Sequence, residues 1–330
     1  MRFLVPLAAV FGLVLLAYLG VGLAGLHTLF GVVLPYVAIA VFIVGVVMKV
    51  LKWGKSPVPF RIPTTCGQQK SLDWIKSNPI ENPSTGFGAF IRMALEVLFF
   101  RSLLRNTKTE VHAGGKLSYG TSELLWICSL LFHYGFLVVV IRHMRFFFEP
   151  VPGVLSALES VDSFLQIGSP PILITGILLL VGLSYLLLRR LFSPQLRYFS
   201  LAADYFPVLL ILAIACTGIL LRHFVRADIV GVKELAMGLA TFSPVAPEGV
   251  HWLFYCHLLL VTTLLIYFPF SKLMHMAGVF LSPTRNLANN NRAVRHINPW
   301  NAPVKVHTYE EYEDDFRERM KEAGIPVEQE

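Results

Sequence analysis

Six long hydrophobic runs divide the chain, with polar stretches between them. The runs cover roughly residues 3–25, 28–50, 120–141, 171–190, 205–225 and 251–271. About 20 consecutive apolar residues are enough for a helix to cross the hydrocarbon core of a bilayer. Because a single span in lipid must satisfy its own backbone hydrogen bonds, each run is predicted to be helical. The pattern lacks the ten-residue alternation of a membrane β-barrel. The sequence therefore predicts an all-α, integral membrane bundle of about six helices.

The first run follows Met1 and Arg2 and has the start of a signal peptide. Its apolar stretch is longer than the roughly 7–15 residues of a cleavable signal, and it continues into the second run near residues 25–28. We therefore expect residues 1–50 to form a retained N-terminal transmembrane hairpin.

The polar segments outside the runs predict three further regions. Residues 51–119 are expected to be a cytoplasmic insertion, in which residues 86–106 form an interfacial amphipathic helix because arginines interrupt its apolar face. Residues 120–280 would form a four-helix transmembrane core. Residues 281–330 are a polar cytoplasmic tail with a predicted helix over 309–323, and its length favours a docking surface for a soluble partner over a solvated tail.

The charge distribution predicts the orientation. The chain is 55% hydrophobic with a net charge of +7. With both termini in the cytoplasm, all but five of its 28 lysines and arginines lie on the cytoplasmic side. The five external ones are Arg142, Arg145, Arg222, Arg226 and Lys233. Lysine and arginine favour cytoplasmic loops, so we predict an N-in/C-in, multi-pass protein of the cell inner membrane. The charge is read as this orientation signal and not as evidence for nucleic acid.

Cysteine gives no metal site on this chain. The four cysteines, Cys66, Cys128, Cys216 and Cys256, are scattered without a C-x-x-C motif. No iron–sulfur or zinc-thiolate site is therefore predicted. Cys66 is expected to be a free thiol in a cytoplasmic loop.

Histidine provides the candidate chemistry, as two pairs in or at the ends of two runs. His133 and His143 are about 15 Å apart along a helix, and His257 and His275 about 27 Å apart. An ionisable residue at membrane depth is a functional candidate, and histidine is a common axial ligand of haem iron. Antiparallel helices would bring His133 toward His275 near the cytoplasmic side, and His143 toward His257 near the external side. We predict two bis-histidine haems b; the alternative is four packing residues. The unequal separations require a bend, which Pro269 is expected to supply.

Other residues are candidates for the surroundings of these sites. Gly135 and Gly218 would let a macrocycle approach the backbone, or are plain helix contacts. The three arginines at the external edge could pair with haem propionates or reach for the interface; they are Arg142, Arg145 and Arg222. Three residues at the start of the sixth run could line a quinone pocket: His251, Trp252 and Tyr255. The alternative is that they lie at the membrane interface, where aromatic residues are common, and have no such role.

Several alternatives stay open at this point. His223 or His251 could replace one of the four assigned ligands. A transporter would show repeats or broken helices with midplane charges, of which the signs are weak. A membrane metalloprotease would need H-E-x-x-H, which is absent. A haem-free anchor would explain the insertion and the tail but not the paired histidines.

Four local strings carry a resemblance to a known family: FHYGF at 132–136, RH at 142–143, YCH at 255–257 and KLMHM at 272–276. Together with the histidine spacings, they resemble the dihaem cytochrome b (gamma) subunit of respiratory nitrate reductase, over about residues 28–280. The extra first span, the insertion and a different tail make the chain look most like the membrane cytochrome b of the sulfite-reduction-associated Dsr complex.

The resemblance implies both cofactors and partners. His133, His275, His143 and His257 would be the axial ligands of two haems b. The chain would be an oxidoreductase subunit that passes electrons between menaquinone or menaquinol and a cytoplasmic iron–sulfur subunit resembling heterodisulfide reductase, in dissimilatory sulfur metabolism. Gamma-type subunits of formate dehydrogenase or hydrogenase are the alternative. The direction of electron flow stays open.

Overall fold

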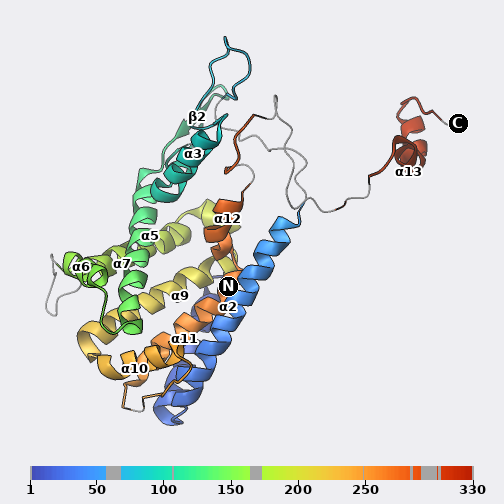
Figure 1. The fold of residues 1–330 in the computed structure, drawn as a ribbon. Helices are drawn as coiled ribbons and strands as arrows, with labels where there is room; N and C mark the ends of the chain where they lie inside the picture. Colours follow the sequence, from blue (N-terminus) through green and yellow to red (C-terminus); the bar gives the residue numbers. More distant parts are fainter. Residues whose placement is uncertain are drawn as a thin grey trace.

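The computed structural model describes residues 2–56, 68–105, 108–163, 173–247, 249–282, 285–290, 303 and 306–328. Within these ranges it is mostly helical (Figure 1). Six of its helices are long and apolar enough to cross a membrane: Leu4–Leu23, Leu29–Gly54, Glu123–Phe147, Ile174–Phe192, Ala202–Val225 and Trp252–Phe270. The predicted all-α bundle of six spans is therefore confirmed. The expectation for Cys66 falls outside the described residues.

Several of the six spans combine an α-helix with a shorter turn of π or 3₁₀ geometry. The α-helices are α1 (Leu4–Ala17), α2 (Leu34–Gly54), α3 (Gly86–Phe99), α4 (Arg101–Leu104), α5 (Glu123–His143), α6 (Gly153–Asp162), α7 (Ile174–Phe192), α8 (Pro194–Phe199), α9 (Ala202–Ile219), α10 (Ile229–Ala240), α11 (Trp252–Tyr267), α12 (His275–Leu281) and α13 (Tyr309–Glu322). The π and 3₁₀ turns are η1 (Tyr18–Leu23), η2 (Leu29–Val33), η3 (Met144–Phe147), η4 (Leu220–Val225), η5 (Phe268–Phe270) and η6 (Lys272–Met274).

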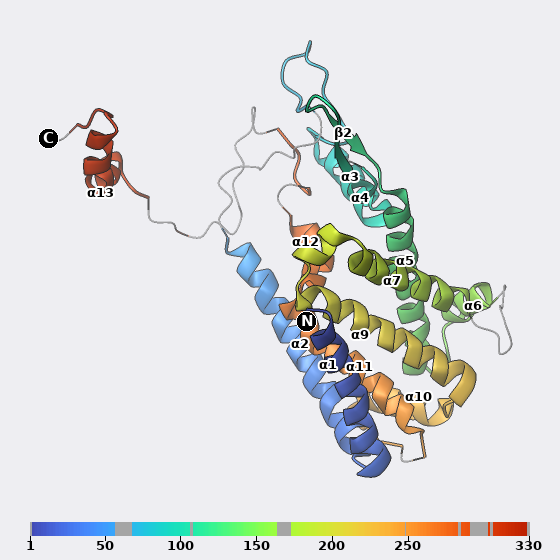
Figure 2. The same cartoon turned by 180° about the vertical axis from the view of Figure 1, so that it is seen from behind.

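The spans pack as a row with one additional helix against it. α5 packs on α7, α7 on α9, α9 on α11 and α11 on α2, and α1 packs against both α9 and α11 (Figures 1 and 2). The larger buried cluster joins α1, α9 and α11 around Tyr205, Leu210 and Tyr255. A smaller cluster joins α7 and α9 around Leu183 and Ile211. In this order of packing, α7 and α9 stand between α5 and α11. Together, α5 and α11 carry three of the four histidines.

Two glycines allow α5 and α7 to approach closely. A Cβ at Gly182 would lie 2.8 Å from the carbonyl oxygen of Cys128 and 2.8 Å from the amide nitrogen of Phe132. A Cβ at Gly135 would lie 3.1 Å from the carbonyl oxygen of Thr175. Small residues at such positions let two helix backbones pack in direct contact. Packing against α7 therefore accounts for Gly135 without a cofactor.

The first two spans form a helical hairpin. α1 and η1 lead to a turn at Gly25, whose φ of 65° is in the left-handed region that glycine adopts easily. η2 and α2 then return along the bundle. Gly20 and Phe30 pack together across the turn, where a Cβ at Gly20 would meet the Phe30 ring at 2.5 Å.

The insertion departs from the predicted single helix over 86–106. α3 ends at Phe99, because Phe100 adopts a left-handed conformation (φ 50°, ψ 44°), and the short α4 follows. An antiparallel hairpin of β1 (Lys108–Val111) and β2 (Leu117–Gly120) then leads into α5. This hairpin was not predicted; its only strong signal is the pair Gly114 and Gly115, both at positive φ in the turn.

The described part of the insertion is attached to the bundle and to the segment after α12. The indole of Trp126 and the hydroxyl of Tyr134, both on α5, donate to the carbonyl oxygens of Phe99 and Leu98. Asn289 donates to Asn82 within a buried contact at 2.7 Å. Arg285 pairs with Glu96 at 2.7 Å. The start of the C-terminal segment and the insertion therefore form one region at the α12 end of the bundle.

The C-terminal helix matches its prediction closely. α13 begins with a capping box, in which the Thr308 hydroxyl accepts from the Glu311 amide and the Glu311 carboxylate accepts from the Thr308 amide. It ends before Gly324, which adopts a φ of 70°.

We expect the contact between α5 and α7 to limit stability. Gly182→Ala places a methyl group against the α5 backbone, which cannot move aside as a flexible side chain would, so it should destabilise the fold by about 1–3 kcal/mol. Gly12→Ala on α1 is the matched control, because a Cβ there meets nothing within 4 Å. Thermal unfolding of the purified protein in detergent should show a lower midpoint for the first variant only. Equal midpoints would contradict this packing.

Candidate functional site

Four imidazole rings face each other as two pairs. The rings of His143 and His257 have centroids 6.3 Å apart and planes 16° apart, close to parallel. The rings of His133 and His275 have centroids 6.2 Å apart and planes 83° apart, close to perpendicular. The structure thus brings together the same two pairs that the sequence predicts. Their role as ligands remains a prediction.

The break after α11 explains how the unequal spacings are accommodated. α11 ends at Tyr267, and Pro269 lies in the 3₁₀ turn η5. Ser271 is extended (φ −118°, ψ 177°), so the chain leaves the helix axis before η6 and α12 begin. His275 opens α12, beyond this break. The predicted bend at Pro269 is therefore confirmed, and it removes the mismatch of a straight helix.

Each of the four rings uses its Nδ1 atom in a hydrogen bond. His133 Nδ1 lies 2.8 Å from the carbonyl oxygen of Ser129. His143 Nδ1 lies 2.7 Å from that of Val139, and His275 Nδ1 lies 2.8 Å from that of Lys272. A carbonyl oxygen only accepts, so Nδ1 carries the proton in these three rings. Each ring therefore presents its Nε2 atom with a free lone pair.

His257 is also protonated at Nδ1, but its hydrogen-bond acceptor lies on another helix. Its Nδ1 lies 2.9 Å from the hydroxyl oxygen of Thr217 on α9. That hydroxyl also lies 2.8 Å from the carbonyl oxygen of Ala213, to which it donates its proton. The hydroxyl oxygen therefore accepts from His257 Nδ1. Thr217 was not singled out from the sequence, because a threonine that bonds back to its own helix has no distinct signal there.

The separation of the two rings in each pair fits a metal ion held between them. A metal–imidazole bond is about 2 Å long and the ring centroid lies about 1 Å beyond the nitrogen, so one shared ion sets the centroids roughly 6 Å apart. A metal-bound histidine usually donates its other ring N–H to an oxygen, as all four do here. Within the described residues no group of three or more potential ligand side chains is found. Two protein ligands per site suit a metal that arrives with its other ligands already in place, as haem iron does.

The two candidate glycines differ in surroundings. A Cβ at Gly218 would lie 3.2 Å from Cε1 of His257, so this glycine keeps the space beside a paired ring open. Gly135 faces the backbone of α7 instead, as described above. Gly218 is thus the glycine whose missing side chain bears on a histidine pair.

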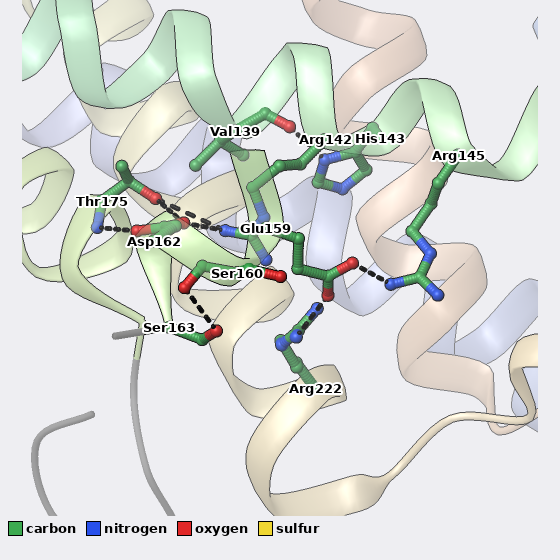
Figure 3. A network of polar contacts seen from close by, with 10 residues as sticks. All are labelled: Val139, Arg142, His143, Arg145, Glu159, Ser160, Asp162, Ser163, Thr175 and Arg222. Atoms are coloured by element: carbon green, nitrogen blue, oxygen red, sulfur yellow. Dashed lines mark hydrogen bonds and ion pairs between the residues drawn. The ribbon is translucent and has the colours of Figure 1, made fainter. Parts of the chain in front are cut away.

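The three candidate arginines are held by carboxylates of α6 (Figure 3). Arg142 pairs at 2.5 Å with Asp162, whose side chain is 2% exposed and also accepts from the backbone and the hydroxyl of Thr175. Glu159 pairs with both Arg145 and Arg222, the latter at 2.9 Å. The ion pairs join α5, η3 and η4 to α6, and the Thr175 hydrogen bonds join α7 to it. The sequence did not predict them, because it gives no signal for which carboxylate of a polar loop folds back.

One nitrogen of the Arg142 guanidinium takes no part in these ion pairs. Within the described residues, Arg142 Nε is buried without a hydrogen-bond partner. It stands next to His143 in the chain and would suit a carboxylate of a bound group. Pairing with haem propionates remains a prediction for all three arginines.

The residues suggested for a quinone pocket lie at or just before the start of α11, within six residues of His257. The ring of His251 accepts from the Leu253 amide and so caps the helix. Tyr255 is fully buried, and its hydroxyl donates to the carbonyl oxygen of Pro247. Trp252 packs edge-on against Tyr18 of η1. His223 lies half-buried in η4. The rings of His251 and Trp252 contact each other, with centroids 5.7 Å apart, whereas the Tyr255 ring packs against His27 at 5.3 Å.

These observations define a multi-span helical membrane protein with two facing histidine pairs. The chain belongs to the nitrate reductase gamma subunit family, whose model matches residues 87–296.

Three relatives agree with this family. The chain is 44% identical over 279 residues to the Hdr-like menaquinol oxidoreductase cytochrome b-like subunit of Archaeoglobus fulgidus, covering 82% of this chain and 83% of that protein. The protein of the same name from Archaeoglobus profundus is 42% identical over 274 residues, or 81% of each chain. The respiratory nitrate reductase 1 gamma chain of Escherichia coli is 32% identical over 184 residues, which cover 51% of this chain and 77% of that protein.

The ion pairs of Glu159 predict a dependence of stability on pH. Burial alone would raise the pKa of the Glu159 carboxyl, but the hydrogen bond from Arg222 and the charges of Arg145, Arg222 and Arg142 outweigh it and hold the pKa below its ordinary value. A carboxyl with a lowered folded-state pKa stabilises the fold above the unfolded pKa, about 4.3 for glutamate. That stability is lost as the pH falls through the folded-state pKa.

Glu159→Gln should therefore lower the unfolding midpoint at neutral pH and weaken its decline below about pH 4.3. Glu149→Gln is the control, since Glu149 is 64% exposed in its pair with Lys233 and exposed pairs contribute little. Midpoints measured from pH 3 to 8 test this. Parallel curves for wild type and Glu159→Gln would show that the pairs do not stabilise the fold.

Proposed function

We propose that this chain is the dihaem cytochrome b subunit of a membrane oxidoreductase, which passes electrons between menaquinol and a cytoplasmic iron–sulfur partner. The observation that carries the proposal is the arrangement of the four imidazoles. Both pairs stand at the separation that one shared metal ion requires, and each Nδ1 is already hydrogen-bonded. Unrelated packing histidines have no reason to share both features.

The family supports the redox assignment. Two relatives are named cytochrome b-like subunits of an Hdr-like menaquinol oxidoreductase, and each aligns with more than four-fifths of this chain. We infer from this that the chain is the corresponding subunit here, with menaquinone or menaquinol as its diffusible substrate. The nitrate reductase relative covers a smaller part of the chain, so a nitrate reductase role is less well supported.

The proposed roles of the residues follow from the geometry. His133 with His275, and His143 with His257, would each provide two Nε2 ligands to a haem b. The haems would supply the one-electron chemistry, while the chain supplies ligands, spacing and a water-poor surrounding. The backbone carbonyls and Thr217 fix which ring nitrogen is protonated. Gly218 would leave room beside His257.

The predicted orientation would assign the two ends of the bundle. With both termini in the cytoplasm, the His133/His275 pair would lie toward the cytoplasm and the His143/His257 pair toward the outside. Menaquinol would then react near the outer pair, with His251, Trp252 and Tyr255 as candidate pocket residues. The partner would dock on the insertion and the tail, residues 51–119 and 281–330. The contacts of Asn289 with Asn82 and of Arg285 with Glu96 support a common surface for the two segments.

The partner proposed here is an iron–sulfur subunit resembling heterodisulfide reductase, and the pathway is dissimilatory sulfur metabolism. The resemblance to the Dsr cytochrome b and the Hdr-like relatives both favour it. Gamma-type subunits of nitrate reductase, formate dehydrogenase or hydrogenase are the alternative, and co-purification of the partner separates them.

The haem content tests the proposal directly. A reduced-minus-oxidised visible spectrum and a pyridine haemochrome assay of the purified chain should give two haems b per chain. His143→Ala and His257→Ala should each lower the count to one, because each removes a ligand of the same site. His112→Ala is the control, since that ring lies in the β-hairpin and bonds Ser118 Oγ at 2.7 Å. Two haems retained in both site variants would refute the assignment of this pair.

A further inference from the structure

The two histidine pairs differ in the angle between their ring planes. His143 and His257 are nearly parallel at 16°, whereas His133 and His275 are nearly perpendicular at 83°. Both rings of the perpendicular pair and His143 of the parallel pair bond a carbonyl oxygen of the preceding turn, whereas His257 bonds the Thr217 hydroxyl. A local carbonyl bond is therefore found in both pairs and does not by itself fix the perpendicular arrangement, so the other contacts of the His133 and His275 rings bear on it.

Two phenyl rings contact His133. Phe132, its neighbour in the chain, packs at 4.5 Å with planes 62° apart. Phe100 packs at 4.8 Å with planes 85° apart. Phe100 comes from the insertion and not from α5, so it contacts the ring from outside the helix that carries it. A ring held edge-on in this way cannot rotate freely about its bond to Cβ without a clash.

The segment that carries Phe100 is itself held in place on both sides. Before it, the Leu98 and Phe99 carbonyl oxygens accept from Tyr134 and Trp126 of α5. After it, the amide and hydroxyl of Ser102 donate to the Glu96 carboxylate at 3.0 and 2.5 Å. Phe100 itself has the left-handed backbone that joins α3 to α4. A non-glycine residue in that conformation persists only where its surroundings determine it.

We propose that Phe100 is a positioning residue for the His133/His275 pair, which sets the rotation of the His133 ring and with it the perpendicular ring planes. The inference rests on the proposed function, because it concerns rings that would ligate a haem. It assigns to the insertion a second role beside partner docking. A residue of the insertion would then control the electronic structure of the nearer haem.

The ring angle has a measurable consequence. In a low-spin ferric haem with two imidazole ligands, parallel planes donate to the same iron d orbital and separate two orbitals that perpendicular planes leave nearly equal in energy. Near-equal orbitals give a more anisotropic electron paramagnetic resonance (EPR) signal, with its first peak at lower field. The wild-type protein should therefore show two low-spin signals of unequal anisotropy. The more anisotropic signal should survive in His143→Ala, which removes the other site.

Phe100→Gly is the decisive variant, because it removes the phenyl ring and suits the left-handed backbone. It should keep two haems per chain while the more anisotropic signal broadens and its first peak moves to higher field. Phe242→Gly is a closely matched control: Phe242 also has a positive φ (59°), and its ring is 84% exposed and stacks on Tyr36 instead of a histidine. That variant should have the wild-type spectrum. Phe100→Tyr keeps the aromatic ring and should also show the wild-type spectrum.

The outcomes separate this inference from the proposed function. Fewer than two haems in the wild type would count against the proposed function itself. Two haems with an unchanged signal in Phe100→Gly, or two wild-type signals of equal anisotropy, would overturn the role of Phe100 alone. If Phe100→Gly loses one haem, Phe100→Leu decides, because it fills the space without a flat ring edge. A shifted signal there supports the role, and a wild-type signal overturns it.

Discussion

The facing of two imidazole rings across the bundle is the constraint on which the rest of the structure depends. For the ligand role proposed above, each ring needs a free Nε2, and this requires an oxygen acceptor at Nδ1. Three of the four rings find it in the turn that precedes them, and His257 finds it in Thr217 of α9. The two pairs also have nearly equal centroid separations, 6.2 and 6.3 Å, although the histidine spacings along the chain are unequal. The break at Pro269 and the extended Ser271 make this possible.

Much of this could be predicted from the sequence, for reasons that differ between elements. The six spans follow from run length alone, and α13 from its capping residues and Gly324. Helix direction and spacing permit the pairing of the histidines without requiring it. The break at Phe100 could not be predicted, because nothing in a phenylalanine signals a left-handed backbone; tertiary contacts impose it. The pairing of Glu159 with two arginines likewise depends on how a polar loop folds back.

The contacts of the insertion show more than its sequence predicts. From its sequence, residues 86–106 form an amphipathic helix whose apolar face belongs at the membrane interface. In the structure, Phe87 and Phe90 of α3 are indeed largely exposed, at 73% and 68%. The other end of the same segment reaches the His133 ring through Phe100. One short helix thus has one surface open to its surroundings and one end at the proposed site.

The acceptor of His257 has a consequence for the order of assembly. His133, His143 and His275 each obtain their protonation state from a carbonyl within four residues, so folding of the local turn is sufficient. His257 depends on a hydroxyl forty residues away on a different helix. Under the proposed function, its ring would reach the tautomer needed for ligation only after α9 and α11 have packed together. Three of the four rings would therefore be prepared during helix formation, and the fourth only when the bundle has closed.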